Sequence, residues 1–382
     1  AIKHEAYNYL LYLNRGIVYM RLKKYDEAKQ DFTHAIFLYP AHQGSHYYYG
    51  ICCLQAGYTI PGILALNYAA TINPSSSYTI DALKELDGLY NNGINTYNKD
   101  NDITISPDIE EKNEFYKHIT PALNSTLASN PHFKNESKID HLIVKSNQIV
   151  FQNIQPRPNS YTIEDQLYAP FFSQIMKDKK FNTFCYYELS NTNIDDGAVN
   201  KKASKMGADM DKFIQFIIQN MKESASKGLG IENAEGYYYI YDDNLNLSKW
   251  GKMRDAAHND FTKEGEWKEL DNNSLSIVNF QNDVPNGTMR VYNYGILSTA
   301  ITLKQGIPDG MGYQYAISTN DKDSILVTSV MIVNGEQHGP RKYYNNSGIL
   351  TEEATMDDSY YEGEVREYDN QGHLSKIMNY SS

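Results

Sequence analysis

Cysteine and tryptophan are scarce in this sequence, and long apolar runs are missing. The 382 residues include 3 cysteines and 2 tryptophans. Cys52, Cys53 and Cys185 are odd in number and contain no CxxC spacing, so they imply no disulfide framework and argue against a structural zinc site. No apolar run reaches the roughly 18 to 20 residues that a membrane helix needs. The sequence therefore predicts neither a disulfide-bonded scaffold nor a membrane span.

Positive charge is also in short supply. The chain has 35 Lys and Arg against 47 Asp and Glu, a net charge of -12 at pH 7. This balance argues against a nucleic-acid partner and against contact with anionic membranes, because both depend on Lys and Arg. The sequence begins with Ala1 rather than Met, which we interpret as processing or truncation. A missing N-terminal anchor is the one expected route to a membrane, and cytoplasmic, periplasmic and cell-envelope locations stay open.

Two internal repeats with different periods are the most informative features that are present. Four positions near the N-terminus recur 34 residues later: Gly16 as Gly50, Phe32 as Leu66, Ala35 as Ala69 and Pro40 as Pro74. Apolar residues at helical spacing predict two helices within residues 7–40, and Pro40 ends the second because proline cannot continue a helix. Repeats of this kind build solenoids, whose usual product is an extended surface rather than a buried reaction site.

These N-terminal segments resemble the tetratricopeptide repeat, most clearly in Asn14–Tyr19 and Tyr25–Ala28. The resemblance covers two repeats, and residues 78–97 are expected to form a third or capping helix. It implies that the first helix of each repeat lines a concave groove, at Leu13, Ile17, Met20, Tyr47, Ile51 and Leu54. All six are apolar, which implies either an amphipathic helix as ligand or no ligand. A groove filled by the chain's own next helix is the open alternative.

The C-terminal third carries a second repeat, in which a glycine precedes a large apolar residue by five positions. The pairs are Gly265 and Leu270, Gly287 and Tyr292, Gly310 and Tyr315, Gly339 and Tyr344, and Gly363 and Tyr368. We interpret each glycine as a hairpin-turn residue, and we expect the five partners to form one ladder along a sheet. This predicts a single antiparallel sheet over about 260–380, with an insertion at 318–322. It also predicts that truncating Tyr344 costs more stability than truncating Arg341.

The C-terminal units resemble MORN repeats, and more closely the variant known from bacterial antitoxin components. The segments that carry this resemblance are Asn334–Tyr344 and Gly348–Leu350. It implies a fold of successive hairpins, and it says little about function, because such repeats serve as scaffolds in many settings.

The middle of the chain predicts a linker followed by a mixed domain. Residues 99–111 are acidic and polar, as is typical of a linker. Residues 112–250 predict an α+β domain of no assignable family. Its expected elements are a strand pair at 142–154, a helix at 164–177, a strand at 181–189, a helix at 209–223 and a strand at 237–241.

Candidates for chemistry are weak, and no cofactor is implied. Cys185 could be a nucleophile, and His42 with His46 could bind a metal, but a buried structural cysteine and unliganded histidines are favoured. Asp242–Asn244 predicts a turn, and Gly228–Gly230 lacks the Lys-Ser/Thr of a phosphate loop.

The whole pattern predicts a multidomain α+β protein. The expected segments are TPR-like repeats at 1–98, a linker at 99–111, an α+β domain at 112–250 and MORN-like β-repeats at 251–382. The leading hypothesis is a non-enzymatic scaffold or adaptor that binds protein partners in a bacterial assembly. The alternatives are an antitoxin-like neutralising partner of a toxin or effector, and an enzyme with its active site in the middle domain.

Overall fold

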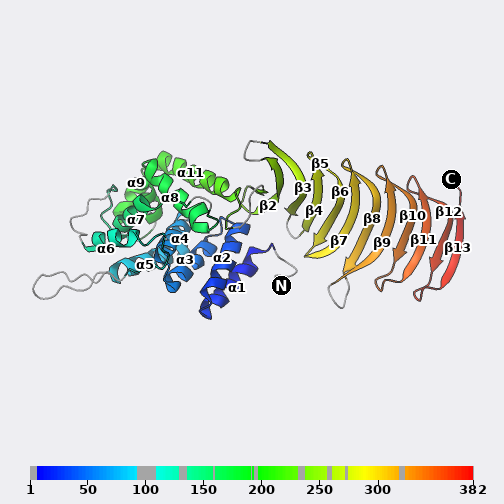
Figure 1. Ribbon diagram of the computed structural model, residues 1–382, viewed down its shortest axis with the longest axis horizontal. Helices are drawn as coiled ribbons and strands as arrows, with labels where there is room; N and C mark the ends of the chain where they lie inside the picture. The colour runs from blue at the N-terminus through cyan, green and yellow to red at the C-terminus, as the bar shows by residue number, and fades with distance from the viewer. Residues whose placement is uncertain are drawn as a thin grey trace, which may run out of the picture. The chain divides into compact units, whose positions relative to one another are not determined.

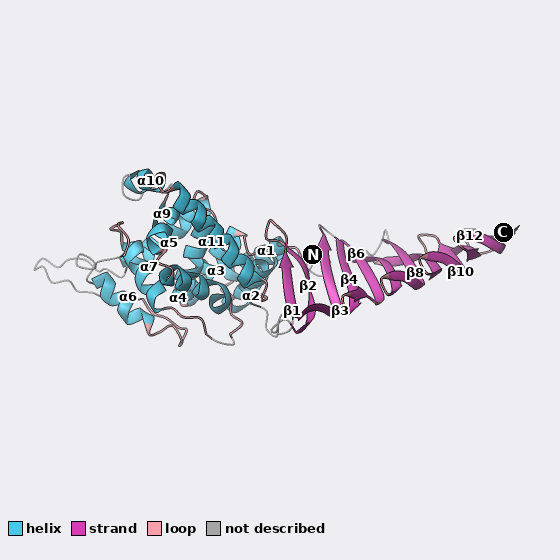
Figure 2. Ribbon diagram, turned by 90° about the horizontal axis from the view of Figure 1, so that it is seen from above, coloured by secondary structure: helices cyan, strands magenta, loops and turns pink. Residues whose placement is uncertain are grey.

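The computed structural model shows two compact units (Figure 1, Figure 2). It describes residues 7–92, 109–128, 136–157, 160–190, 192, 197–230, 237–255, 260–271, 274–317 and 323–381. The helical unit comprises residues 8–233 and 241–246, and the β unit comprises 1–7, 234–240 and 247–382. The predicted linker at 99–111 lies outside the described residues except for 109–111, and the predicted insertion at 318–322 lies wholly outside them.

Five helices at the start of the helical unit form the repeats. They are α1 (Tyr9–Arg21), α2 (Tyr25–Leu38), α3 (Gln43–Ala56), α4 (Thr59–Ile72) and α5 (Ser77–Asn92). The first four make two antiparallel pairs, and α5 is the third helix that the sequence predicts. Helices predicted over 7–97 are confirmed as far as the described residues reach.

The repeated glycines explain why both helix pairs close in the same way. A Cβ at Gly16 would lie 2.6 Å from a ring carbon of Phe32, and one at Gly50 would lie 2.8 Å from Cγ of Leu66. In each repeat the missing side chain lets the second helix press a large residue against the backbone of the first. The 34-residue period therefore reflects the same glycine contact between the two helices of each repeat.

The second part of the helical unit consists of helices in its described residues, so the strands predicted at 142–154 and 181–189 are wrong. These are α6 (Ile119–Ala128), α7 (Leu142–Asn153), the π-helix η2 (Glu164–Tyr168), α8 (Ala169–Lys177), α9 (Phe181–Leu189), α10 (Ala198–Ala203) and α11 (Gly207–Ala225). The helices predicted at 164–177 and 209–223 are confirmed, and the first changes from π to α geometry at Ala169, next to Pro170.

The two strand predictions in this part failed for a common reason. Residues 142–154 and 181–189 are rich in β-branched and aromatic side chains, which favour strands locally. In α9 the buried residues Phe181, Phe184, Cys185 and Leu189 nevertheless recur at helical spacing, and in α7 every residue from 142 to 148 is buried. These rings pack into the core of the unit, so tertiary packing decides against the local propensity.

The β unit contains one sheet of 13 strands, arranged in chain order except that the short β5 pairs with β4. The strands are β1 (Tyr237–Tyr241), β2 (Leu247–Asp255), β3 (Asp260–Asp271), β4 (Ser274–Gln281), β5 (Val284–Pro285), β6 (Gly287–Asn293), β7 (Ile296–Lys304), β8 (Ile307–Ile317), β9 (Ser324–Val333), β10 (Glu336–Tyr344), β11 (Leu350–Asp357), β12 (Tyr360–Tyr368) and β13 (Leu374–Tyr380). The antiparallel sheet predicted over 260–380 is confirmed. It also includes the strand predicted at 237–241, and residue 251, the predicted domain boundary, lies inside β2.

The repeat glycines are not turn residues, which corrects the interpretation of the sequence. Gly265, Gly310, Gly339 and Gly363 lie within strands, and Gly287 begins β6. All five have positive φ, from 67° to 130°. In four of the units a two-residue turn ends four positions before the repeat glycine. Both residues of each turn also have positive φ, and the turns lie at 282–283, 305–306, 334–335 and 358–359. This is the geometry of type I′ hairpins.

Two rows of side chains cross the strands. The residues five positions after the repeat glycines each pair with a leucine on a neighbouring strand: Leu270 with Leu275, Tyr292 with Leu297, Tyr315 with Leu326, Tyr344 with Leu350 and Tyr368 with Leu374. These residues, here called the tyrosine–leucine row, are half-buried or exposed. A second row, here called the central row, lies three positions earlier in each unit, and it includes Trp267, Gly312, Arg341 and Val365.

Candidate functional site

The predicted groove residues lie on the first helices of the two repeats. Leu13 in α1 is buried, with 6% of its surface exposed. The other five are half-buried: Ile17 and Met20 in α1, and Tyr47, Ile51 and Leu54 in α3. The opposite side of the repeats is different, because every residue from 59 to 71 in α4 is buried. Five of the six predicted groove positions are thus partly accessible, and Leu10, Val18 and Leu22 in α1 are more exposed than they are.

One groove residue is turned partly toward the repeat itself. A Cβ at Gly62 in α4 would lie 2.5 Å from Leu54, so Leu54 fills the space where the first repeat carries Ala28. This contact explains why the second repeat departs from the pattern at Gly62. Leu54 therefore contributes to packing between α3 and α4 as well as to the groove.

The third helix changes the chemistry of the groove. The 34-residue register that links Leu13 to Tyr47 and Ile17 to Ile51 continues to Asp81 and Glu85 in α5. Burial raises the pKa of Tyr47 to about 12, and the carboxylates of Glu85 and Asp81 contribute to that rise, which places them near the Tyr47 hydroxyl. The predicted groove positions are thus apolar in α1 and α3, and the equivalent positions of α5 are acidic.

A separate cavity of about 670 Å³ lies within the helical unit. One wall is the face of α2 that carries Asp26 and Lys29, and the facing wall is the segment that enters η2. Glu164, the first residue of η2, has 4% of its surface exposed and accepts a hydrogen bond of 2.6 Å from the Tyr49 hydroxyl. We call this space the Lys29–Glu164 cavity.

The wall formed by η2 is held by the residue next to Glu164. Asp165 pairs with Arg157 at 2.6 Å, and it accepts hydrogen bonds from the hydroxyls of Ser160 and Thr162. These partners hold the pKa of Asp165 below its usual value against the opposing effect of burial. The network fixes the turn from which Glu164 enters the cavity, so the position of Glu164 does not depend on a ligand.

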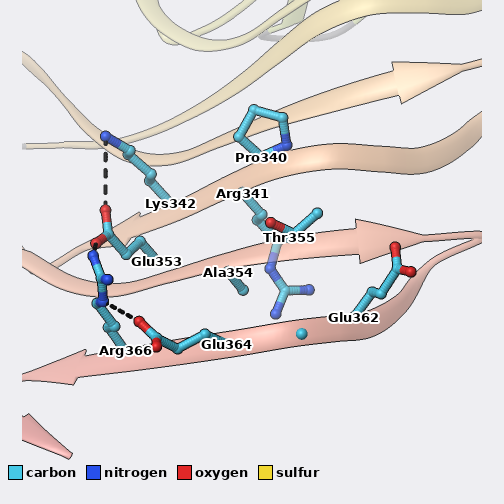
Figure 3. Close-up of a pocket in the computed structure, with 10 residues that line it drawn as sticks. Pro340, Arg341, Lys342, Glu353, Ala354, Thr355, Glu362, Glu364 and Arg366 are labelled. Atoms are coloured by element: carbon cyan, nitrogen blue, oxygen red, sulfur yellow. Dashed lines mark hydrogen bonds and ion pairs between the residues drawn. The ribbon is translucent and has the colours of Figure 1, made fainter. Parts of the chain in front are cut away.

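The β unit has a shallow charged groove of about 520 Å³ on strands β10 to β12 (Figure 3). Lys342 pairs with Glu353 at 3.9 Å, Arg366 pairs with Glu353 at 3.2 Å, and Arg366 also pairs with Glu364 at 2.5 Å. Each of these charges is matched by a neighbour across or along the strands. The arrangement suits cross-strand stabilisation better than the capture of an external ion.

Arg341 lies in the central row and is more buried than its charge suggests. It has 9% of its surface exposed, pairs with Glu352 at 3.0 Å, and lies 4.8 Å and 4.6 Å from the ring centres of Tyr343 and Tyr361. A guanidinium between two rings and a carboxylate is a structural anchor for three strands. The sequence analysis missed this role, although Arg341 follows Gly339 by two positions as Trp267 follows Gly265.

The cysteine and histidine candidates are occupied by structural contacts. Cys185 is buried in α9, where burial raises the pKa of its thiol well above the usual value, so the nucleophilic thiolate is disfavoured. His42 caps α3 by accepting a hydrogen bond from the Ser45 amide. His46 lies between the Pro40 carbonyl and the Tyr168 hydroxyl, each at 2.8 Å. Asp242 forms the predicted turn by accepting from the Asn244 and Asn246 amides.

Among the described residues, one group of three side chains could hold a metal ion. His338, Asp357 and Asp358 place one donor atom each within 4.8 Å of one another. All three are at least partly exposed, and His338 pairs with Asp357 at 2.8 Å. Sequence spacing had not singled out this group, because hairpin pairing brings its members together.

Comparison with known proteins supports the N-terminal repeat. Residues 9–42, which span α1, α2 and the turn into α3, match the family model of the tetratricopeptide repeat. No curated protein matches the chain. Within the described residues, no helix combines the length and apolar character needed to cross a membrane. Tetratricopeptide repeats generally mediate protein–protein interactions, and the helical N-terminus of this chain contains such a repeat.

Proposed function

We propose that this chain is a non-enzymatic scaffold or adaptor that binds a protein partner in the groove of α1 and α3. The observation that carries the proposal is the accessibility of that groove. Ile17 and Ile51 are half-exposed at equivalent positions of two successive repeats, whereas α4 behind them is buried throughout residues 59–71. An apolar strip of this kind suits the apolar face of an amphipathic helix.

The charge of α5 adds a preference for one kind of partner. Asp81 and Glu85 continue the groove register beyond Tyr47 and Ile51, and both are exposed. A partner helix that lies along the groove would meet apolar residues first and two carboxylates at the α5 end. The partner that fits is an amphipathic segment with Lys or Arg at that end.

The test is the double substitution Ile17→Glu with Ile51→Glu, used in affinity capture with identification of the captured proteins. Burying two unpaired carboxylates against an apolar ligand should weaken binding by roughly a hundredfold or more. Leu10→Glu with Val18→Glu is the matched control, because these α1 residues are 44% and 52% exposed and are not at groove positions. We expect the control pair to retain every partner of the unchanged protein.

Circular dichroism of both variants separates binding from folding. If the groove variant keeps its helical signal and its partners, the repeats are a spacer and the proposal is wrong. An adaptor should capture several subunits of one assembly. A single dominant captured protein of toxin or effector type would favour the alternative of a neutralising partner.

A further inference from the structure

The Lys29–Glu164 cavity gathers three charged groups that the described part of the chain leaves without ion pairs. They are the carboxylates of Asp26 and Glu164 and the ammonium of Lys29. Asp26 is exposed at the rim, Lys29 is half-buried, and Glu164 is almost completely buried. A buried charge is costly unless an opposite charge or a hydrogen-bond donor meets it, so a ligand with complementary charged groups would be favoured here.

Tyr49 connects the two deepest charges. Its hydroxyl donates to one oxygen of Glu164 at 2.6 Å, and its ring centre lies 5.9 Å from Nζ of Lys29. Lys29 also lies 4.2 Å from the ring centre of Tyr58. The two rings contact the ammonium, and the Tyr49 hydroxyl binds the carboxylate. A positive and a negative group are thus fixed near each other without forming a direct pair.

Two further features of the lining come from segments that are distant in sequence. Glu164 begins a π-helix, a rare geometry that is frequent at functional sites. Gly230 approaches α2 so closely that a Cβ there would lie 2.2 Å from Thr33, and its amide donates to Gln166 in η2. The cavity is therefore lined by three segments that are distant in sequence.

The charges define the ligand that would complete the site. Two carboxylates against one ammonium disfavour a phosphate or another anion. A metal ion is disfavoured too, since the described residues bring three donor side chains together at His338 and not in this cavity. A ligand with an ammonium for Glu164 and Asp26 and an oxygen acceptor for Lys29 satisfies all three charges. The volume of about 670 Å³ falls in the range of small-molecule sites.

We propose that the Lys29–Glu164 cavity binds a primary α-ammonium group adjacent to a carboxylate or carbonyl, as found in a free amino acid or at the amino terminus of a peptide. Glu164 and Asp26 receive the ammonium, and Lys29 receives the carboxylate or carbonyl oxygen. This inference is independent of the groove on α1 and α3, so the two proposals stand or fall separately.

Isothermal titration of the full chain with four classes of probe tests the chemistry. The probes are the free L-amino acids, their amides, their N-acetyl derivatives and tripeptides with free amino ends. We expect at least one free-amine probe to bind and its N-acetyl derivative not to bind. Binding confined to amino acids and amides identifies a free amino acid as the ligand, and binding of tripeptides identifies a peptide terminus. If N-acetylation leaves affinity unchanged, or if no free-amine probe binds, the proposal is overturned.

Three variants test the assignment of roles with the binding probe. Glu164→Gln keeps an oxygen for the Tyr49 hydroxyl but removes the charge, and it should weaken binding at least about tenfold. Lys29→Met should weaken binding of free amino acids and, to a smaller extent, of their amides, because Lys29 receives the carboxylate or the carbonyl oxygen. Glu27→Gln is the matched control, because Glu27 is an exposed neighbour on α2 that pairs with Lys24 and does not line the cavity.

Folding failure would not hide the result. If Glu164→Gln loses its helical circular dichroism, Asp26→Asn at the exposed rim replaces it, with an expected loss of several-fold. A variant that folds and binds as tightly as the unchanged protein excludes Glu164 or Asp26 from ammonium binding and overturns the proposal.

Discussion

The helical unit and the β unit bury their side chains to very different extents. In the helical unit Phe151, Phe172 and Phe184 are at most 1% exposed and contact one another. In the sheet the tyrosine–leucine row is half-buried or exposed, and burial is confined to residues such as Trp267, Ala354 and Val365. The described residues of the β unit form one sheet without a second layer, so this sheet depends on its backbone ladder and on cross-strand pairs. Stability is concentrated in a few rings in one unit and distributed over many pairs in the other.

The largest loss of stability is expected from a substitution in the core of the helical unit. Phe172→Ala removes a fully buried ring that stacks on Phe151 with centres 4.1 Å apart. We expect a loss of about 3 to 5 kcal/mol in the free energy of unfolding of the helical unit. Denaturant titration followed by helical circular dichroism measures it.

Tryptophan fluorescence is the internal control, because the two tryptophans, Trp250 and Trp267, lie in strands of the β unit. The fluorescence transition should not move. An equal shift of both signals would show that the two units unfold together, and the contrast between them would then be wrong.

Acid should act on the helical unit through His46. Burial lowers the pKa of His46 to about 3, where its Nε2–H donates to the Pro40 carbonyl and its Nδ1 accepts from Tyr168. The unfolded chain, with a pKa near 6.5, binds the proton first as the pH falls. Stability should therefore fall by about 1.4 kcal/mol per pH unit below pH 6, to a loss of about 3 kcal/mol at pH 4.

His46→Gln should remove this slope, whatever it does to stability at neutral pH. Thermal unfolding of the helical signal at a series of pH values measures the difference. His118→Gln changes an exposed histidine of the same unit and should keep the acid dependence. Identical slopes in all three proteins would exclude His46 as the origin.

In the sheet, Arg341→Ala should cost more than Tyr344→Ala, the reverse of what the repeat pattern predicted. Arg341 loses its pair with Glu352 and two ring contacts, which we expect to cost about 2 kcal/mol. Tyr344 is half-buried, so Tyr344→Ala should lower the free energy of unfolding by about 1 kcal/mol. Amide hydrogen exchange in β10 to β12 measures both. Equal loss of protection would mean that the central row has no special role.

The repeats were predictable because each repeated residue serves a local, recurring contact. Gly16 and Gly50 mark helix pairs, and the glycines of the β unit mark positions of positive φ in successive hairpins. The spacing of these residues was enough to predict the helices as far as Asn92 and the antiparallel sheet. It could not tell a turn glycine from a glycine within a strand, because both need positive φ.

Helices α7 and α9 and the cavity were not predictable in the same way. The strand-forming residues of 181–189 form a helix because Phe181 and Phe184 enter a core built from distant segments. Glu164 and Lys29 lie 135 positions apart and meet only through the packing of η2 near α2. The wrong burial assignment of Arg341 has the same origin, because its partners Glu352 and Tyr361 lie on two other strands.

The smallest expected effects concern two glutamates, one in each unit. Their contributions to stability should depend on pH in opposite directions. Glu188 is buried in the helical unit, where burial raises its pKa well above the usual value. Its stabilising contribution is present below the unfolded pKa near 4.5 and is lost as the pH rises. Glu353 in the sheet has its pKa lowered by the Tyr368 hydroxyl and by Arg366 and Lys342. Its contribution is present at neutral pH and is lost as the pH falls.

Glu188→Gln should therefore stabilise the helical unit at pH 8 relative to pH 5, by about 1 kcal/mol, because it removes a buried carboxyl group whose ionisation is opposed by burial. Glu353→Gln should weaken the sheet slightly at pH 7 and have no effect at low pH, because its ion pairs are partly exposed and each contributes little. Helical circular dichroism and tryptophan fluorescence follow the two units across the same pH series. The same sign of pH dependence in both variants would contradict these assignments. Glu188 is assigned to a closed core, and Glu353 is assigned to an open strand surface where its charge is matched. Opposite signs would show that burial opposes ionisation of Glu188 in the helical unit, whereas charged neighbours favour ionisation of Glu353 in the sheet.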